Sequence, residues 1–219
     1  MSNFFVQSLG DDGYALTVPG YVIIGIIIFA VLVLAAKIST HGKKVTAKNL
    51  AFAAAAIALA MVTSMIKLFH LPMGGSVTLF SMLFVTLIGN WYGPAVGIMA
   101  GVSYGLLQFI IDPYILSLPQ VLFDYVFAFG ALDLSGFFSN RKHGLVRGYI
   151  LGIFGRFVFA VLSGVIFFGQ WAPEELGPWK YSIAYNGSYI FAEGFATIVV
   201  LLIPAVGSAM RSVKAQAVQ

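Results

Sequence analysis

The sequence predicts an all-α membrane protein, with a bundle of six transmembrane helices preceded by one extra N-terminal transmembrane helix. Hydrophobic residues make up 60% of the 219 residues and charged residues only 9%, whereas soluble domains carry about 25% charged residues. The apolar residues also gather in runs close to the roughly 20 residues that a helix needs to cross a bilayer. A soluble domain of this size could not bury so much apolar surface, so the sequence implies a lipid bilayer as its surroundings.

Seven apolar segments are expected to cross the membrane. They cover residues of about 20–38, 48–69, 76–91, 93–111, 116–137, 146–168 and 187–210. The third segment is short and contains Thr78, Ser81 and Thr86, which makes it the weakest candidate. The first segment has the length of a signal peptide but lacks a basic region before it, so we interpret it as an anchored extra helix.

The segments divide the chain into three parts. Residues 1–47 are expected to form an extracellular tail, the extra helix and a cytoplasmic loop. Residues 48–212 form the six-helix body, and residues 213–219 a cytoplasmic tail. The loop 41–47 is the seam between the extra helix and the body. Because no internal repeat is evident, the pattern argues against the inverted-repeat class of secondary carriers.

The basic residues indicate the direction of the helices, because cytoplasmic loops are enriched in lysine and arginine. With seven spans, one side holds Lys37, Lys43, Lys44, Lys48, Arg141, Lys142, Arg147, Arg211 and Lys214. The other side holds Lys67 and Lys180, together with Asp11, Asp12, Asp112, Glu174 and Glu175. The N-terminus is therefore expected outside and the C-terminus in the cytoplasm of the cell. This asymmetry also accounts for the net charge of +4 without a nucleic-acid partner.

A carboxylate, Asp124, interrupts the fifth apolar segment. A buried carboxylate needs a cation or several hydrogen-bond donors. One interpretation is an ion pair with Arg156 or a hydrogen-bonded core acid; the other is a counter-charge for a cationic or amine-bearing solute. Tyr114 and Tyr125 are expected at the same depth, and aromatic faces bind organic cations well. This combination favours the ligand-binding interpretation.

Polar and aromatic residues also mark the entrance to the last segment, at Trp179, Tyr181, Tyr185, Asn186 and Tyr189. An aromatic belt at the membrane surface would explain Trp179 and Tyr189 without a ligand. A belt does not explain an amide such as Asn186, which needs a specific partner. Tyr181 and Asn186 are therefore the better ligand candidates.

Two further charges, Arg156 and Glu193, lie deep in the sixth and seventh segments. We expect them to form a structural pair, either with each other or through Asp124, and we take a gating role as the alternative. Intramembrane charges are costly and face the interior or a partner.

Small residues recur at the spacing that lets helices approach closely. Glycines occur at 89, 93, 97, 101 and 105, where internal packing is the first interpretation and a docking surface the second. The second segment carries two alanine pairs, Ala51/Ala55 and Ala56/Ala60. These pairs fit internal packing and a subunit interface equally well.

The sequence contains none of the patterns typical of an enzyme. It lacks a Walker A motif, a metal-ligand spacing and a nucleophile elbow, and it has no cysteine. We therefore expect no catalytic activity, no metal and no cofactor. Uphill transport would have to draw on an ion gradient or on partner subunits.

Several blocks of the sequence, in order, resemble the thiamine-specific S component of energy-coupling factor (ECF) transporters. They are residues 71–79, 104–110, 113–125, 163–169 and 179–189, and the resemblance covers about residues 48–210. It implies a six-helix substrate-binding membrane subunit that captures thiamine from outside. It also implies partners, namely a transmembrane coupling protein and two ATPases.

The resemblance assigns roles to particular residues. It implies a ligand pocket formed by Tyr114, Asp124, Tyr125, Gly164, Phe168, Tyr181 and Asn186. We add Trp179, whose indole could stack on a ligand ring. The resemblance also favours Ala51, Ala55, Ala56 and Ala60 as the face that docks on the coupling protein.

The sequence departs from the family pattern at the ligand site. Asp124 stands where the family usually has glutamate, and Ala160 where it has histidine. Tryptophans of some members fall near Gly75 and Phe168. These differences leave open a related heteroaromatic ligand, such as a vitamin B6 vitamer or a thiamine precursor. An ion-coupled secondary carrier is the alternative mechanism.

Overall fold

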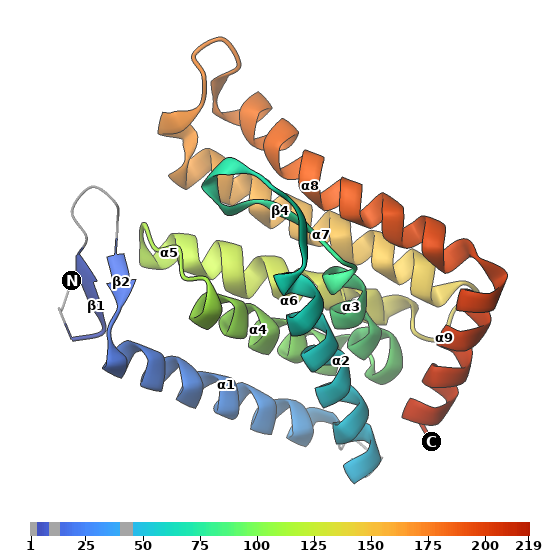
Figure 1. The fold of residues 1–219 in the computed structure, drawn as a ribbon. Helices are drawn as coiled ribbons and strands as arrows, with labels where there is room; N and C mark the ends of the chain where they lie inside the picture. The colour runs from blue at the N-terminus through green and yellow to red at the C-terminus, as the bar shows by residue number, and fades with distance from the viewer. Residues whose placement is uncertain (1–3, 9–13, 40–45) are drawn as a thin grey trace.

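The computed structural model describes residues 4–8, 14–39 and 46–219, and most of these are helical (Figure 1). The expected seam at 41–47 lies largely outside the described residues, as do Asp11, Asp12, Lys43 and Lys44. The chain begins with strands β1 (Val6–Ser8) and β2 (Tyr14–Leu16), which form an antiparallel hairpin, followed by α1 (Val18–Ser39). In Figure 1, α1 lies beside α4 and apart from α8.

The six-helix body follows. Its first half contains α2 (Ala47–Met65), β3 (Lys67–His70), the 3-10 turn η2 (Pro72–Gly74), β4 (Ser76–Thr78), α3 (Ser81–Tyr92) and α4 (Pro94–Ile111). Next come α5 (Leu118–Val121), the π-helical η3 (Leu122–Phe127), α6 (Ala128–Leu132) and η4 (Asp133–Phe138), which make one continuous rod. Its last part contains α7 (Gly144–Phe167), η5 (Gly169–Trp171), α8 (Gly177–Leu202) and α9 (Pro204–Ala217). The all-α membrane architecture with an additional N-terminal helix is confirmed.

Within the described residues, five helical stretches are long and apolar enough to cross a membrane: 47–65, 94–111, 118–138, 144–167 and 177–202. The described apolar part of α1, Val18–Ile27, is shorter. α3 has 12 residues, or about 18 Å at 1.5 Å per residue, which is less than the hydrocarbon thickness. α3 is surrounded by other helices and nearly all of it is buried, so it needs no lipid-facing length.

The bounds predicted for the second and third segments are wrong, because a β-hairpin separates them. β3 pairs antiparallel with β4, and Lys67 lies opposite Thr78. Pro72 begins the connecting turn and Gly74 has a φ of 92°, a conformation that glycine adopts without steric cost. Apolar composition alone did not reveal this hairpin.

The last segment is also bounded differently from the prediction of 187–210. α8 begins ten residues earlier, at Gly177, and ends at Leu202. Ile203 is extended, and Pro204 occupies the first turn of α9, because proline cannot continue a preceding helix but suits the start of a new one. α9 includes most of the expected tail and returns to the body, where Asn49 Nδ2 donates to Ala217 O at 2.6 Å.

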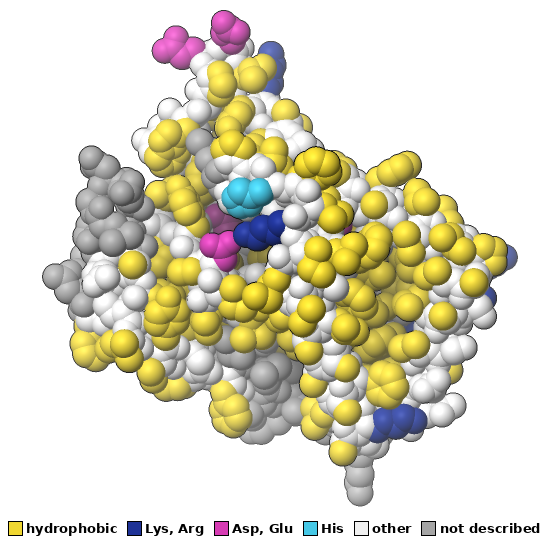
Figure 2. All heavy atoms as spheres, in the orientation of Figure 1, with side chains coloured by type: hydrophobic (Ala, Val, Ile, Leu, Met, Phe, Trp, Pro, Cys, Tyr) yellow, Lys and Arg dark blue, Asp and Glu magenta, His cyan; other side chains and the backbone are white. Residues whose placement is uncertain are grey.

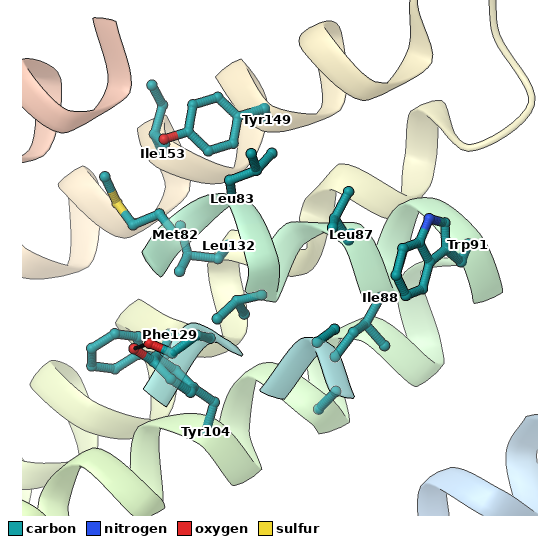
Figure 3. Close-up of a cluster of buried hydrophobic side chains, with 14 of the residues drawn as sticks. Met82, Leu83, Leu87, Ile88, Trp91, Tyr104, Phe129, Leu132, Tyr149 and Ile153 are labelled. Atoms are coloured by element: carbon teal, nitrogen blue, oxygen red, sulfur yellow. Dashed lines mark hydrogen bonds between the residues drawn. The ribbon is translucent and has the colours of Figure 1, made fainter. Parts of the chain in front are cut away.

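The core lies between α3 and the helices around it (Figure 3). Met82, Leu83 and Ile88 of α3 meet Tyr104 of α4 and Tyr149 of α7 in this cluster. Buried threonines do not disturb it: Thr86 Oγ1 donates to Leu83 O at 2.7 Å. The polar residues that made this segment look weak are therefore satisfied within the bundle.

Some of the small residues at helix-packing spacing are buried between helices, and others lie on the protein surface. A Cβ on Gly105 would lie 1.7 Å from Tyr125 O, so α4 touches the 118–138 rod through its glycines, which supports the packing interpretation. Ala56 and Ala60 are 2% and 0% exposed and belong to the core. They cannot contact a partner in this structure, which corrects the docking prediction for these two residues. Ala51 and Ala55 lie exposed on α2.

Candidate functional site

The helices enclose a cavity of about 340 Å³, within the range of about 300–1,000 Å³ typical of small-molecule sites. Its walls come from the β3–β4 hairpin, α4, the segment 112–129, α7 and α8. Figure 2 shows histidine, basic and acidic side chains gathered at a hollow in an otherwise apolar face. The lining includes Lys67, His70 and Asp112. Lys67 Nζ lies 3.1 Å from Asp112 Oδ2, so an ion pair joins the hairpin to the end of α4.

Asp124 lines this cavity from the π-helical η3. Gln120 Nε2 donates to Asp124 Oδ2 at 2.6 Å, while Gln120 Oε1 accepts from Leu116 N at 3.0 Å. The second bond fixes which end of the amide points at Asp124. A π-helical turn widens the helix locally and is common at functional sites. The carboxylate is therefore oriented by a neighbour one turn away and faces a space that can hold a ligand.

The expected structural ion pair of Arg156 is wrong for the part of the chain that the structure describes. There, no ion pair joins Arg156 to Asp124 or Glu193. Arg156 lies over the ring of Phe129, with Cζ 4.4 Å from the ring centroid, a cation–π arrangement. Its guanidinium belongs to the cavity wall.

Glu193 has a different role from the one predicted. Its Oε2 accepts from Thr78 N at 3.0 Å and from Thr78 Oγ1 at 2.6 Å, and its Oε1 accepts from Met82 N at 3.0 Å. Glu193 is 3% exposed. Because the first amides of a helix lack partners within the helix and attract negative charge, Glu193 caps α3 from α8. It also fastens the end of the β3–β4 hairpin.

Aromatic side chains form the outer walls. Tyr114 stacks on Phe168, with ring centroids 5.8 Å apart and an interplanar angle of 22°. Tyr125 holds the segment that carries Tyr114, because its hydroxyl donates to Asp112 O at 2.9 Å and accepts from Tyr114 N at 3.1 Å. On α8, Tyr181 and Tyr185 stack at 5.9 Å. Flat, π-rich walls of this kind suit a planar or cationic ligand.

Asn186 sits at a close contact between α7 and α8. Its Nδ2 donates to Ala160 O at 3.2 Å and Ser182 O at 3.0 Å, and its Oδ1 accepts from Tyr189 at 2.8 Å. A Cβ on Gly164 would lie 2.1 Å from Ser182 Oγ. Gly164 therefore permits the helix contact that places Asn186 in the cavity wall.

Most of the residues predicted for the site share this one cavity. Its lining includes Tyr114, Asp124, Tyr125, Gly164, Phe168, Tyr181 and Asn186. The lining also includes Gly75 and Ala160, two of the positions where the sequence departs from the family pattern. Trp179 lies outside the lining and is 57% exposed. Trp179 precedes Asn186 by two helical turns and so lies about 10 Å nearer the N-terminal end of α8. At that position the aromatic-belt interpretation fits.

Sequence reasoning missed Gln120, Gln108 and Tyr104. All three line the cavity, and Gln108 Nε2 donates to the Tyr104 hydroxyl. A signal was present: Gln120 precedes Asp124 by four residues and Gln108 follows Tyr104 by four, which places each pair on one helix face. Polar residues within apolar spans could have been paired in this way.

Comparison with known proteins gives consistent matches. The family model described as Thiamine transporter protein (Thia_YuaJ) matches residues 50–211. The thiamine transporter ThiT of Bacillus subtilis (strain 168) is 33% identical over 162 residues, which cover 68% of this chain and 83% of the relative. ThiT of Lacticaseibacillus paracasei is 28% identical over 119 residues, covering 47% and 59% respectively. The solved structure of ThiT from Listeria monocytogenes matches with a TM-score of 0.59 and 26% identity, over 72% of this chain and 94% of that chain.

Proposed function

The chain belongs to the thiamine transporter protein family, and from this premise we propose that it captures thiamine from outside the cell as the substrate-binding subunit of an ATP-driven ECF importer. Membership confirms the resemblance to thiamine-specific S components, and it identifies a multi-pass membrane transporter rather than an enzyme. The observation that carries the proposal is the cavity, in which Asp124 faces a space walled by tyrosine and phenylalanine rings.

The chemistry of thiamine matches this cavity. Its thiazolium ring carries a permanent positive charge, which Asp124 can balance, and aromatic faces add a cation–π contribution. Its flat aminopyrimidine suits the paired rings of Tyr114 and Phe168 on one side and of Tyr181 on the other. Asn186 lies in the same wall. Its N–H groups already bond Ala160 O and Ser182 O, so the second lone pair of Oδ1 is what it can offer to a donor at the edge of the ligand.

The cavity is proposed to open toward the outside. α7 has 24 residues, which span about 36 Å at 1.5 Å per residue, enough to cross the bilayer. Phe168, at the C-terminal end of α7, lines the cavity, whereas Arg147 lies at the opposite end. Basic residues favour the cytoplasmic side, so the end with Phe168 faces outward. This orientation places the N-terminus outside and the C-terminus inside.

Partner subunits are proposed to supply the energy. The 219 residues contain no Walker A motif, so in this proposal ATP is hydrolysed by other chains; the resemblance to ECF S components implies two ATPases and a coupling protein. The exposed face of α2 with Ala51 and Ala55 offers small side chains for close contact with another helix. In this proposal, residues 48–212 form the transporting body, and residues 1–47 and 213–219 flank it.

Mass spectrometry of the small molecule that co-purifies with the protein tests the proposal. We expect thiamine to be released on denaturation in about one copy per chain. Release of a vitamin B6 vitamer would retain the transporter class and change the ligand. Thiamine uptake by vesicles that contain this chain without any ATPase would contradict the ATP-driven mechanism.

A further inference from the structure

The N-terminal helix lies before the residues that the family model matches, yet it packs against the segment that leads into the cavity. Ile24 of α1 is 7% exposed and belongs to a hydrophobic cluster distinct from the main core. Leu106 and Phe109 of α4 belong to the same cluster, together with Ile115 and Val121. α1 thus packs along α4, and through this shared cluster it is linked to Ile115 in the connection after α4 and to Val121 at the start of the rod.

The β1–β2 hairpin packs with α1 in this contact. Val6 and Leu16 lie against the same cluster. Thr17 N donates to Phe5 O at 3.1 Å, and a Cβ on Gly20 would lie 2.3 Å from that same oxygen. The hairpin is therefore seated on the first turn of α1. We refer to residues 4–8 and 14–30 together as the N-terminal brace.

The segment beneath the brace carries part of the ligand site. Tyr114 and Gln120 line the cavity, and Gln120 orients Asp124 through the bond of 2.6 Å. Tyr125, whose hydroxyl holds Asp112 O, also packs against the cluster beneath the brace. Because close-packed side chains transmit displacement to their neighbours, a shift of Ile115 or Val121 would move the groups that face the ligand.

We propose that the N-terminal brace is a positioning element of the ligand site, and that Ile24 is its main contact with residues 112–121. The inference rests on the proposed function in one respect, namely that this cavity binds thiamine. The brace does not touch the ligand. It limits the movement of Tyr114 and Gln120, so the ligand-binding arrangement is already formed before thiamine arrives, which lowers the entropic cost of binding.

Truncation of Ile24 tests the proposal. In Ile24→Ala, we expect the Kd for thiamine to rise three- to tenfold, mainly through faster dissociation. We also expect amide hydrogens of residues 112–117 to exchange at least tenfold faster without ligand, while those of α7 keep the wild-type rate. Ile24→Leu should restore both values. The matched control is Ile23→Ala on the outer face of α1, where Ile23 is 39% exposed, and it should change either quantity by less than twofold.

Wild-type protein provides a second test that needs no variant. Because coupling between two sites is reciprocal, thiamine binding should slow amide exchange in residues 14–20 as well as in 112–117. Protection confined to 112–117, or an Ile24→Ala protein with wild-type exchange and affinity, would overturn the proposal. If wild-type protein does not bind thiamine, the proposed function fails, and the ligand-free exchange of Ile24→Ala against Ile23→Ala still decides whether the brace holds the segment.

Discussion

Of the acids that line the cavity, Asp124 and Glu193 lie deep in the bundle and differ in how their oxygens are used. Glu193 directs both oxygens at Thr78, Ser81 and Met82, within the protein. Asp124 is held by Gln120 and faces the cavity from the wider π-helical turn. A carboxylate whose acceptor sites are filled by the protein has little left for a ligand. We therefore propose Asp124 as the carboxylate that recognises the ligand, whereas Glu193 has an architectural role.

Asp124→Asn should weaken thiamine binding at least tenfold, or by about 1.4 kcal/mol, because the neutral amide no longer balances the thiazolium charge. Asp124→Glu retains the charge and should stay closer to the wild type. Calorimetric titration of the purified variants measures both. Glu175→Gln, on the loop before α8, is the control and should leave the Kd unchanged. Equal affinities of the wild type and the Asn variant for thiamine would show that Asp124 does not contribute to binding.

Glu193→Gln should lower the stability of the protein by about 2–4 kcal/mol, because a buried charged acceptor of several hydrogen bonds is replaced by an amide that brings its own donors. Thermal unfolding in detergent detects this as a lower Tm. Glu174→Gln, at an exposed position, should leave the Tm unaltered. A Glu193→Gln protein with the wild-type Tm would show that the cap on α3 is dispensable.

Single residues of the site were predictable to different degrees. Asp124 and Asn186 stand out because intramembrane polar groups require partners. Arg156 and Glu193 could not be assigned correctly, since opposite charges at similar depth suggest a pair. The actual partners of Glu193 are backbone amides and hydroxyls at the end of β4 and the start of α3, and which of these groups approach a side chain depends on the tertiary fold.

At the scale of elements, the contact between α4 and the 118–138 rod is set by glycine. Gly97 and Gly101 of α4 each approach Asp133, and Gly105 approaches the backbone of Tyr125. Gly89 of α3 also approaches Asp133. Asp133 is 0% exposed, and its Oδ1 accepts from Gly89 N at 2.8 Å. The rod that carries Asp124 is therefore fixed in depth by contacts that no larger residue would permit.

Gly105→Ala should destabilise the protein by about 3 kcal/mol, the upper end of the usual cost of overpacking, since the new Cβ would overlap Tyr125 O and force the rod away from α4. The displacement should also weaken thiamine binding. Thermal unfolding of purified protein provides the comparison. The matched control is Gly25→Ala in α1, where a Cβ meets nothing within 4 Å. Similar Tm values for the two variants would contradict the close approach of these helices.

The elements show where hydrophobic patterning succeeds and where it fails. Apolar runs predicted α4, the rod and α7 within a few residues, because each run is bounded by polar or breaking residues. Hydrophobic patterning missed the β3–β4 hairpin. Leu68 and Phe69 of β3 closely follow the apolar run of α2, so strand and helix were counted as one segment. Patterning also misplaced α8, because an amphipathic helical start such as Trp179–Tyr189 reads as a loop when only length and hydropathy are counted.

At the scale of the whole molecule, cavity and basic loops occupy opposite ends of the bundle. The lining residues Lys67, Asp112 and Phe168 lie at one end, and Arg141 and Lys142 lie in the connection before α7. A transporter that captures its ligand from outside needs this arrangement. The orientation of the chain is thus tied to the direction of transport.

Membrane-impermeant labelling of single cysteines tests that orientation. The natural chain has no cysteine, so each variant carries one reactive thiol. We expect Glu175→Cys to be labelled in intact cells and Lys142→Cys to be labelled only after the membrane is permeabilised. Reversed accessibility would place the cavity on the cytoplasmic side.

Titration of the purified chain with thiamine tests the central claim most directly, namely that this cavity holds thiamine against Asp124. Tryptophan fluorescence or calorimetry should show saturation at one ligand per chain with a Kd at or below micromolar concentration. Pyridoxine should compete weakly if at all. If the protein shows a cooperative thermal transition, and is therefore folded, absence of saturation at millimolar thiamine would contradict the account.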